Sequence, residues 1–269
     1  LNHIVDASQT NAALADIGAS IDQDNNLAVS QNIVADNKCS GTGLLLADCV
    51  NVDTLNRIDT ITQGNSAEGT LDASSTQVNN AVFNQNMVLL NDCDETELGS
   101  SDPICENFEP SNIVGPITQT SANNAGFEAL GATITQSNDA QVTQDLQAIN
   151  DCDESGVGNN EADCRHYTDN AIHSISQSNN AGVADDFVQN NLVAISQDID
   201  AQNNCHESGD GGNALATGFC GSEVVNNILA VTQHNGAQGS GSADISQVND
   251  NTGMNQDLVA DNTCDQSGP

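Results

Sequence analysis

Positive charge is nearly absent from this chain. Its 269 residues include three Lys and Arg against 38 Asp and Glu, which gives a formal net charge of −35. A protein that binds nucleic acid needs cations to replace the counterions of the phosphates, and an anionic membrane surface repels a chain of this charge. The composition therefore excludes nucleic acid as a partner.

Aromatic residues, long apolar runs and catalytic motifs are scarce too. The chain has five Phe, one Tyr and no Trp. Apolar runs such as Leu44–Leu46 are far shorter than the ~20 residues that span a bilayer, so we expect no membrane insertion. No G-x-S-x-G, H-E-x-x-H or P-loop sequence occurs. We therefore expect no enzymatic activity and assign no catalytic or cofactor-binding residue.

Cysteine reveals an internal repeat. Five cysteines follow one another at intervals of 54, 59, 53 and 59 residues, and each has a Gln eight residues before it and an Asn two residues before it. The cysteines are Cys39, Cys93, Cys152, Cys205 and Cys264; the glutamines are Gln31, Gln85, Gln144, Gln197 and Gln256; the asparagines are Asn37, Asn91, Asn150, Asn203 and Asn262. We interpret residues 1–269 as a single repeat domain, with units 1–49, 50–105, 106–164, 165–220 and 221–269.

Within each unit the pattern has a period of two, which is typical of β-strands. In the fourth unit, alternate residues from Gln189 to Cys205 are Gln, Asn, Val, Ile, Gln, Ile, Ala, Asn and Cys. Such alternation places one set of side chains on one face of a strand. Because the run exceeds the usual strand length, we expect two strands joined by a corner. In the fifth unit the pattern slips by one residue between Asn249 and Gln256, which predicts a bulge.

The amides on the apolar face need a physical explanation. A buried primary amide costs a few kcal/mol if it has no partner. Identical amides can bond to one another when equivalent strands lie in register about 4.8 Å apart. We therefore predict an all-β fold, a repeat β-solenoid in which the repeated Gln and Asn form two ladders.

The pattern resembles a known family of fibre subunits. Gln136-x-Asn138-x-Ala140-x-x-x-Gln144 is similar to the Gln/Asn/Ala repeats of curlins, the subunits of curli functional-amyloid fibres. The resemblance covers about half of the chain and implies a secreted fibre subunit with inward Gln and Asn ladders. The chain departs from curlins in its longer unit, its cysteines and its lack of regular glycines beside the Gln.

The remaining cysteines follow the first set at short intervals. They are Cys49, Cys105, Cys164 and Cys220, which lie 10, 12, 12 and 15 residues after Cys39, Cys93, Cys152 and Cys205. We predict four disulfides that close acidic loops, each stabilising the fold by roughly 2–3 kcal/mol. Zinc is the competing interpretation, but C-x-x-C spacing is missing. Disulfides favour an extracellular or cell-surface location.

Cys264 has no downstream partner in this sequence. We expect it to be unpaired or to bond outside the chain, either to more of the same unit or to a neighbouring subunit.

Acidic loops offer weak calcium candidates. Asp92 and Asp94, like Asp151 and Asp153, place carboxylates at alternate positions, as the start of an EF-hand loop does. The bidentate Glu at the far end of such a loop is missing. Solvated acidic loops are the simpler interpretation, and calcium is the only cofactor that the sequence suggests.

The repeats favour a structural role. We expect a subunit that stacks end to end with copies of itself into an extracellular filament, because open solenoid ends are unpaired strand edges. Two alternatives stay open at this point. One is a monomeric adhesin or ligand- or ice-binding solenoid, and the other is a pilin that exchanges a donor strand.

Overall fold

The computed structural model describes residues 1–15, 18–41, 48–69, 74–96, 104–124, 132–155, 163–208 and 219–267. Within these ranges every regular element is a β-strand, and the paired strands run parallel, so the all-β prediction is confirmed. The strands are β1 Asn2–Ala15, β2 Ser20–Gly41, β3 Cys49–Val52, β4 Leu55–Gly69, β5 Ser74–Thr96, β6 Ile104–Val114, β7 Ile117–Asn124, β8 Thr133–Ser155, β9 Asp163–Ile172, β10 Ile175–Ser208, β11 Phe219–Ile228 and β12 Val231–Ser267.

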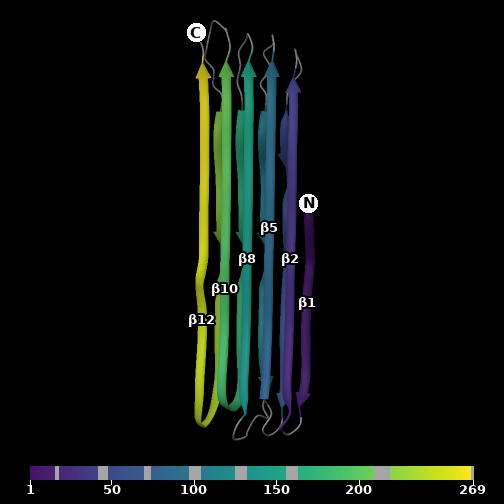
Figure 1. Ribbon diagram of the computed structural model, residues 1–269, viewed down its shortest axis with the longest axis vertical. Coiled ribbons are helices and arrows are strands. Elements are labelled where there is room, and N and C mark those ends of the chain that lie inside the picture. Colours follow the sequence, from purple (N-terminus) through teal and green to yellow (C-terminus); the bar gives the residue numbers. More distant parts are fainter. Residues whose placement is uncertain are drawn as a thin grey trace.

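The strands form two layers that lie face to face (Figure 1). The long-strand layer contains β2, β5, β8, residues 186–208 of β10 and residues 244–267 of β12. The return layer contains β1, β3, β4, β6, β7, β9, β11, residues 175–181 of β10 and residues 231–238 of β12. β10 and β12 each pass from one layer to the other at the lower end of the molecule.

Each long strand and the return strands before it make one tier, and five tiers stack side by side. Tier 1 is residues 1–41, tier 2 is 48–96, tier 3 is 104–155, tier 4 is 163–208 and tier 5 is 219–267. The expected corner in the long run is not formed. The residues from Ser74 to Thr96 make one strand of 23 residues, because β5 pairs along its whole length with β2 and β8.

The register places like residues beside like. Gln31 pairs with Gln85, and the same column continues through Gln144, Gln197 and Gln256. A slip of one residue would turn the inward face of a strand outward, so the alternating pattern fixes this register. β10 and β12 lose register between the pairs Leu192–Asp250 and Ala194–Gly253, which confirms the bulge predicted in the fifth unit.

The interior between the layers contains apolar clusters separated by amides. The central cluster includes Ile58, Ile61, Phe83, Val142 and Ile195, all at most 1% exposed. A second cluster lies beside the bends at the lower end, and a third, around Leu89 and Leu146, lies between the central cluster and the cysteines. The cysteines form a separate cluster at the opposite end from the bends.

The return layer is broken where backbones of neighbouring tiers come very close. Gly115 directly follows the last residue of β6, and its backbone N–H donates to the carbonyl of Ile58 at 2.6 Å. A Cβ atom at Gly115 would lie 1.6 Å from the carbonyl oxygen of Asp59. Only glycine fits this approach.

Candidate functional site: the amide ladders and the cysteine column

The repeated glutamines form a continuous ladder. Each Nε2 donates to the Oε1 of the preceding tier, with distances of 2.8 Å for Gln85 to Gln31, 2.9 Å for Gln144 to Gln85, 2.8 Å for Gln197 to Gln144 and 2.6 Å for Gln256 to Gln197. The ladder predicted from the sequence is confirmed.

The same glutamines also join the two layers. Gln85 Nε2 lies 3.1 Å from the carbonyl oxygens of both Asn56 and Ile113, which belong to the return layer. A buried amide is tolerated when its polar atoms are paired. In the described part of the chain, the buried side-chain atoms without a partner are Asn80 Oδ1, Asn123 Nδ2, Thr168 Oγ1 and Asp169 Oδ1, and none belongs to a glutamine.

The predicted asparagine column is confirmed as well. Nδ2 donates to Oδ1 of the following tier at 3.1 Å from Asn37 to Asn91, 3.0 Å from Asn91 to Asn150, 3.0 Å from Asn150 to Asn203 and 2.8 Å from Asn203 to Asn262. Asn51 and Asn107 of the return layer lie between these residues and donate to Asn91 and Asn150 at 2.9 and 2.8 Å. The donors of this column therefore point the opposite way from those of the Gln ladder.

The structure contains ladders that the sequence analysis did not single out. Gln63 donates to Gln9 and Gln77 to Gln23, each at the head of a further glutamine column. Asn25 donates to Asn79, and Asn2 donates to Asn56. The complete additional columns are Gln9, Gln63, Gln119, Gln177 and Gln233; Gln23, Gln77, Gln136, Gln189 and Gln247; Asn25, Asn79, Asn138, Asn191 and Asn249; and Asn2, Asn56, Asn112, Asn170 and Asn226. Repeated Gln-x-Asn pairs in the sequence, such as Gln63-x-Asn65 and Gln77-x-Asn79, already indicated the first three of these.

His166 replaces an asparagine in the return layer. It lies beside Asn107 in register, is fully buried, and its Nε2 lies 2.9 Å from the carbonyl oxygen of Gln202. Asn107 Nδ2 lies 3.3 Å from its Nδ1. A ring that donates from Nε2 and accepts at Nδ1 is neutral. Burial, which outweighs the bond to the Gln202 carbonyl, lowers the pKa of His166 to about 4.

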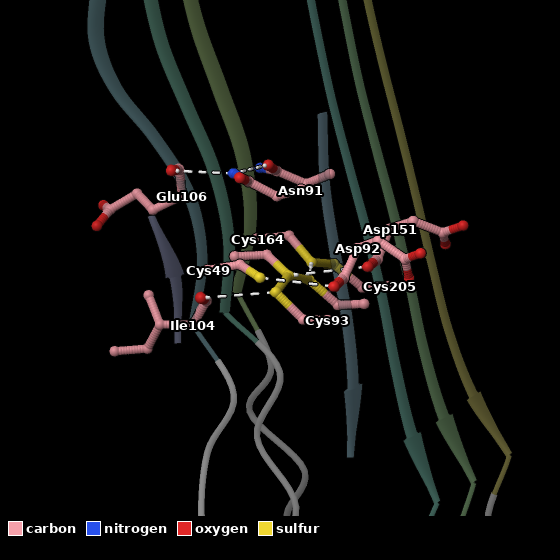
Figure 2. Close-up of a disulfide and its surroundings, with 12 residues drawn as sticks. Cys49, Asn91, Asp92, Cys93, Ile104, Glu106, Asp151, Cys164 and Cys205 are labelled. Atoms are coloured by element: carbon pink, nitrogen blue, oxygen red, sulfur yellow. Dashed lines mark hydrogen bonds between the residues drawn. A yellow bond between two sulfur atoms is a disulfide. The ribbon is translucent and has the colours of Figure 1, made fainter. Parts of the chain in front are cut away.

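The cysteines form a column in which the two layers alternate (Figure 2). The structure contains the expected Cys39–Cys49 bond. It bonds Cys164 to Cys205 and Cys220 to Cys264, whereas we expected bonds from Cys152 to Cys164 and from Cys205 to Cys220 and no partner for Cys264 within the chain. Those three expectations differ from the structure.

Cys105 is placed at bonding distance from two cysteines. One is Cys93, as expected, and the other is Cys152 of the same tier as Cys105. The sequence could not distinguish these pairings, because stacking brings each interior cysteine as close to a neighbour in the next tier as to one in its own. The loops between the cysteine pairs, 42–47, 97–103, 156–162 and 209–218, lie outside the described residues.

The calcium candidates lie outside this column. Asp92 pairs in register with Asp151, and Asp94 with Asp153. Asp92 forms an ion pair with Lys38, with Oδ2 and Nζ 3.2 Å apart. Among the described residues, the only groups of three potential metal ligands with donor atoms within 4.8 Å of one another consist of cysteines. The structure does not assemble the four aspartates into a calcium site.

The outer face of the long-strand layer concentrates negative charge. Asp145, Asp198 and Asp257 are neighbours on three adjoining strands. Partial burial, followed by repulsion from Asp198 and Asp200, raises the pKa of Asp145. Partial burial, followed by repulsion from Asp153 and Asp92, raises the pKa of Asp151. Cations that screen this face are therefore expected to stabilise the stack.

The two outer tiers leave interior residues uncovered. Leu258 stacks on Ile199 and faces the interior, yet it is 44% exposed while Ile199 is fully buried. Ile245 is 49% exposed although its neighbour Phe187 is 1% exposed. On the opposite edge, a cavity of about 490 Å³ opens beside Leu1, Ile4 and Gln31. Both edges of the stack therefore present the interior of the fold to solvent.

Comparison of the chain with protein-family models, curated proteins and solved structures finds no match in any of the three. In the part of the chain that the structure describes, there is no helix of the length and apolar character needed to span a membrane. Disulfides persist in oxidising compartments, so the bonded cysteines indicate an oxidising environment.

Proposed function

We propose that this chain is a β-solenoid that stacks end to end with copies of itself into an extracellular, curlin-like structural filament. The observation that carries the proposal is the chemical complementarity of its two open edges. Tier 1 is one edge and tier 5 is the other, and each exposes a strand whose backbone groups are unpaired on one side.

The Gln ladder gives each edge a different hydrogen-bonding character. Gln31, at the tier 1 edge, donates to the carbonyls of Asn2 and Arg57 and has no glutamine beneath it. Gln256, at the tier 5 edge, has donated to Gln197 and keeps its Oε1 for a further donor. A second copy on tier 5 would bring its own Gln31 amide to that oxygen.

The asparagine column completes the match in the opposite sense. Asn37, at the tier 1 edge, has donated to Asn91 and presents Oδ1. Asn262, at the tier 5 edge, has accepted from Asn203 and presents Nδ2. Tier 5 of one copy and tier 1 of the next therefore pair donor with acceptor at both columns. Two identical edges would instead bring donor to donor and acceptor to acceptor.

This contact is heterologous and does not close on itself. A head-to-tail contact that repeats without closing generates a filament. Stacking would also bury Leu258, Ile245 and Met254, which face the interior but are 37% to 49% exposed at the edge. Removing apolar surface from water stabilises such a contact by roughly 25 cal/mol per Å².

A pair of adjacent residues on the tier 5 edge tests the proposal. Leu258 faces the interior and is 44% exposed, and Val259 faces outward beside Asp200 and is 46% exposed. Leu258→Lys places a charge in the stacking surface and is expected to abolish filaments. Val259→Lys adds the same charge outside that surface and is expected to leave them intact.

The readouts are electron microscopy and sedimentation velocity on the purified chain at high salt. Monomers in the Leu258→Lys sample with filaments in the wild type and Val259→Lys samples support the proposal. A wild-type chain that remains monomeric at high concentration and high salt contradicts it, and favours a monomeric adhesin.

A further inference from the structure

The sulfur atoms from Cys93 to Cys264 form an unbroken series. The series alternates between the long-strand layer, with Cys93, Cys152, Cys205 and Cys264, and the return layer, with Cys105, Cys164 and Cys220. Three overlapping groups have their sulfur atoms within 4.8 Å of one another: Cys93, Cys105 and Cys152; Cys152, Cys164 and Cys205; and Cys205, Cys220 and Cys264. Figure 2 shows part of this series between the layers.

Each interior cysteine has a partner within reach on both sides. The Cα atom of Cys105 lies 6.4 Å from that of Cys93 and 6.5 Å from that of Cys152, and both distances suit a disulfide. Cys164, bonded to Cys205, has its Sγ 2.7 Å from the Sγ of Cys152. Cys220 lies in reach of Cys205 and Cys264.

The seven sulfur atoms of the series cannot all be paired with one another. Of the nine cysteines, Cys39 and Cys49 bond to each other outside the series. The other seven can form at most three disulfides, and one thiol is left over. With Cys164–Cys205 and Cys220–Cys264 bonded, Cys105 can form a disulfide with Cys93 or with Cys152 but not with both. The remaining thiol is then Cys152 or Cys93, and both are fully buried.

We propose that this thiol migrates along the column by thiol–disulfide exchange and becomes a modification site at Cys264. This inference concerns the isolated chain and does not depend on the filament. The Cys152 thiolate attacks Cys164, so that the Cys152–Cys164 bond forms, the Cys164–Cys205 bond breaks and Cys205 leaves as the thiolate. Cys205 then attacks Cys220, and the Cys264 thiolate leaves. Each step exchanges one disulfide for another and needs no oxidant.

Alternation between the layers restricts where the thiol can be. When every bond joins neighbours in the series, only cysteines of the long-strand layer can remain unpaired. Cys264 is the one member of that set within the series that is exposed, since Cys93, Cys152 and Cys205 are at most 4% exposed. A small disulfide R–S–S–R would be attacked there by the Cys264 thiolate, which forms a mixed disulfide and releases R–S⁻.

Modification of Cys264 would fix the whole column in one pattern of disulfide bonds. With Cys264 blocked, the remaining sulfurs pair as Cys93–Cys105, Cys152–Cys164 and Cys205–Cys220. We therefore expect the folded 269-residue chain at mildly alkaline pH to take up one equivalent of N-ethylmaleimide, at Cys264, and non-reducing peptide mapping to find those three bonds. A label on an interior cysteine of the folded chain, or no label on a chain that shows one thiol after acid quenching and unfolding, would overturn the proposal.

Two edge variants provide a parity test that does not require Cys264 to be reactive. Cys264→Ser removes a cysteine of the long-strand layer. Each of the six remaining sulfurs of the series can then pair with a neighbour, so we expect no thiol after unfolding. Cys220→Ser removes a return-layer cysteine and is expected to show two thiols. Equal thiol counts in the two variants, or any label on Cys105 or Cys164 in the quenched wild type, would contradict exchange along an alternating column.

Discussion

At the scale of the residue, stability rests on ladder amides that are buried and hydrogen-bonded to one another. Gln144 is fully buried, donates to Gln85 and accepts from Gln197. It also donates across the interior to the carbonyl oxygens of Asn112 and Ala171. A single residue in the ladder therefore joins three tiers and both layers.

Replacing that residue should be costly. Gln144→Leu removes these bonds and takes the Gln144 donor away from the buried Gln85 Oε1 and from the two carbonyl oxygens, so we expect a loss of about 3 kcal/mol in the free energy of unfolding. Gln141→Leu is the matched control, because Gln141 is exposed and its side chain donates to the Asp139 carboxylate at 3.1 Å. The control should stay within about 0.5 kcal/mol. Urea denaturation of the monomer measures both, and equal losses would contradict the ladder's role.

His166 predicts a loss of stability in acid. Its pKa of about 4 in the folded chain lies below the ordinary value of 6.5, so the unfolded chain binds the proton more readily between these values. The stability that the neutral ring provides is complete above pH 6.5 and falls by about 3 kcal/mol as the pH drops to 4. The raised pKa values of Asp145 and Asp151 act in the opposite direction, because protonation removes the cost of partly burying their charge and then relieves the repulsion from neighbouring aspartates.

Substitution by the residue of the neighbouring tier isolates this effect. His166→Asn restores the type found at Asn107 and carries no titratable group. The variant should match the wild type at pH 7.5 or exceed it, and lose less stability between pH 6.5 and 4. Parallel curves of unfolding free energy against pH for the two proteins would show that His166 is not the source.

Much of this residue-level chemistry was readable in the sequence. The Gln and Asn offsets predicted two ladders that the structure contains. The position of His166 two residues after Cys164 matches Asn107 after Cys105, so its place in the interior could have been read from the repeat. The cysteine pairing could not, because sequence spacing favours partners within a loop and stacking supplies equally close partners in the next tier.

At the scale of the element, strand length and the breaks in the return layer decide the shape. The alternating pattern predicted strands and their inward faces, and it located the bulge near Asn249. It did not predict that the long runs continue as single strands of 22 or 23 residues. These strands pair with their equivalents along nearly their whole length, β5 and β8 on both sides and β2 on one, and that pairing supports the unusual length.

The break at Gly115 provides a test at this scale. Gly115→Ala would place a methyl group 1.6 Å from the Asp59 carbonyl oxygen, so the backbones of two tiers must separate. We expect a loss of about 3 kcal/mol or more in the free energy of unfolding. Gly64→Ala is the control, since its added Cβ meets only the Thr10 methyl group at 3.6 Å, an ordinary contact. The control should be neutral or stabilising by up to about 1 kcal/mol.

At the scale of the whole molecule, charge and open edges oppose one another. A net charge of −35 repels approaching copies, while the exposed interior of tiers 1 and 5 favours stacking. All three Lys and Arg residues are paired with aspartates, Lys38 with Asp92, Arg57 with Asp59 and Arg165 with Asp163, so they do not offset repulsion between copies. Association should therefore depend on the ions of the solution.

Salt is expected to promote filament growth. Charge repulsion acts over about 30 Å at 0.01 M ionic strength and about 3 Å at 1 M. Sedimentation should find monomers in the first condition and filaments in the second. Calcium and magnesium should be equally effective at equal concentration, because Asp92, Asp94, Asp151 and Asp153 do not form a ligand cluster. A strong preference for calcium would reveal a specific site.

The helical rise of the filament distinguishes end-to-end stacking from any other assembly. Five tiers spaced by about 4.8 Å give an axial rise of about 24 Å for each chain if tier 1 of one copy continues the stack from tier 5 of the last. Cryo-electron microscopy of the filaments should show that rise, with Gln31 of each copy beside Gln256 of its neighbour. A filament with a different rise, or one in which the long-strand layers pack side by side with uncovered edges, would contradict the account.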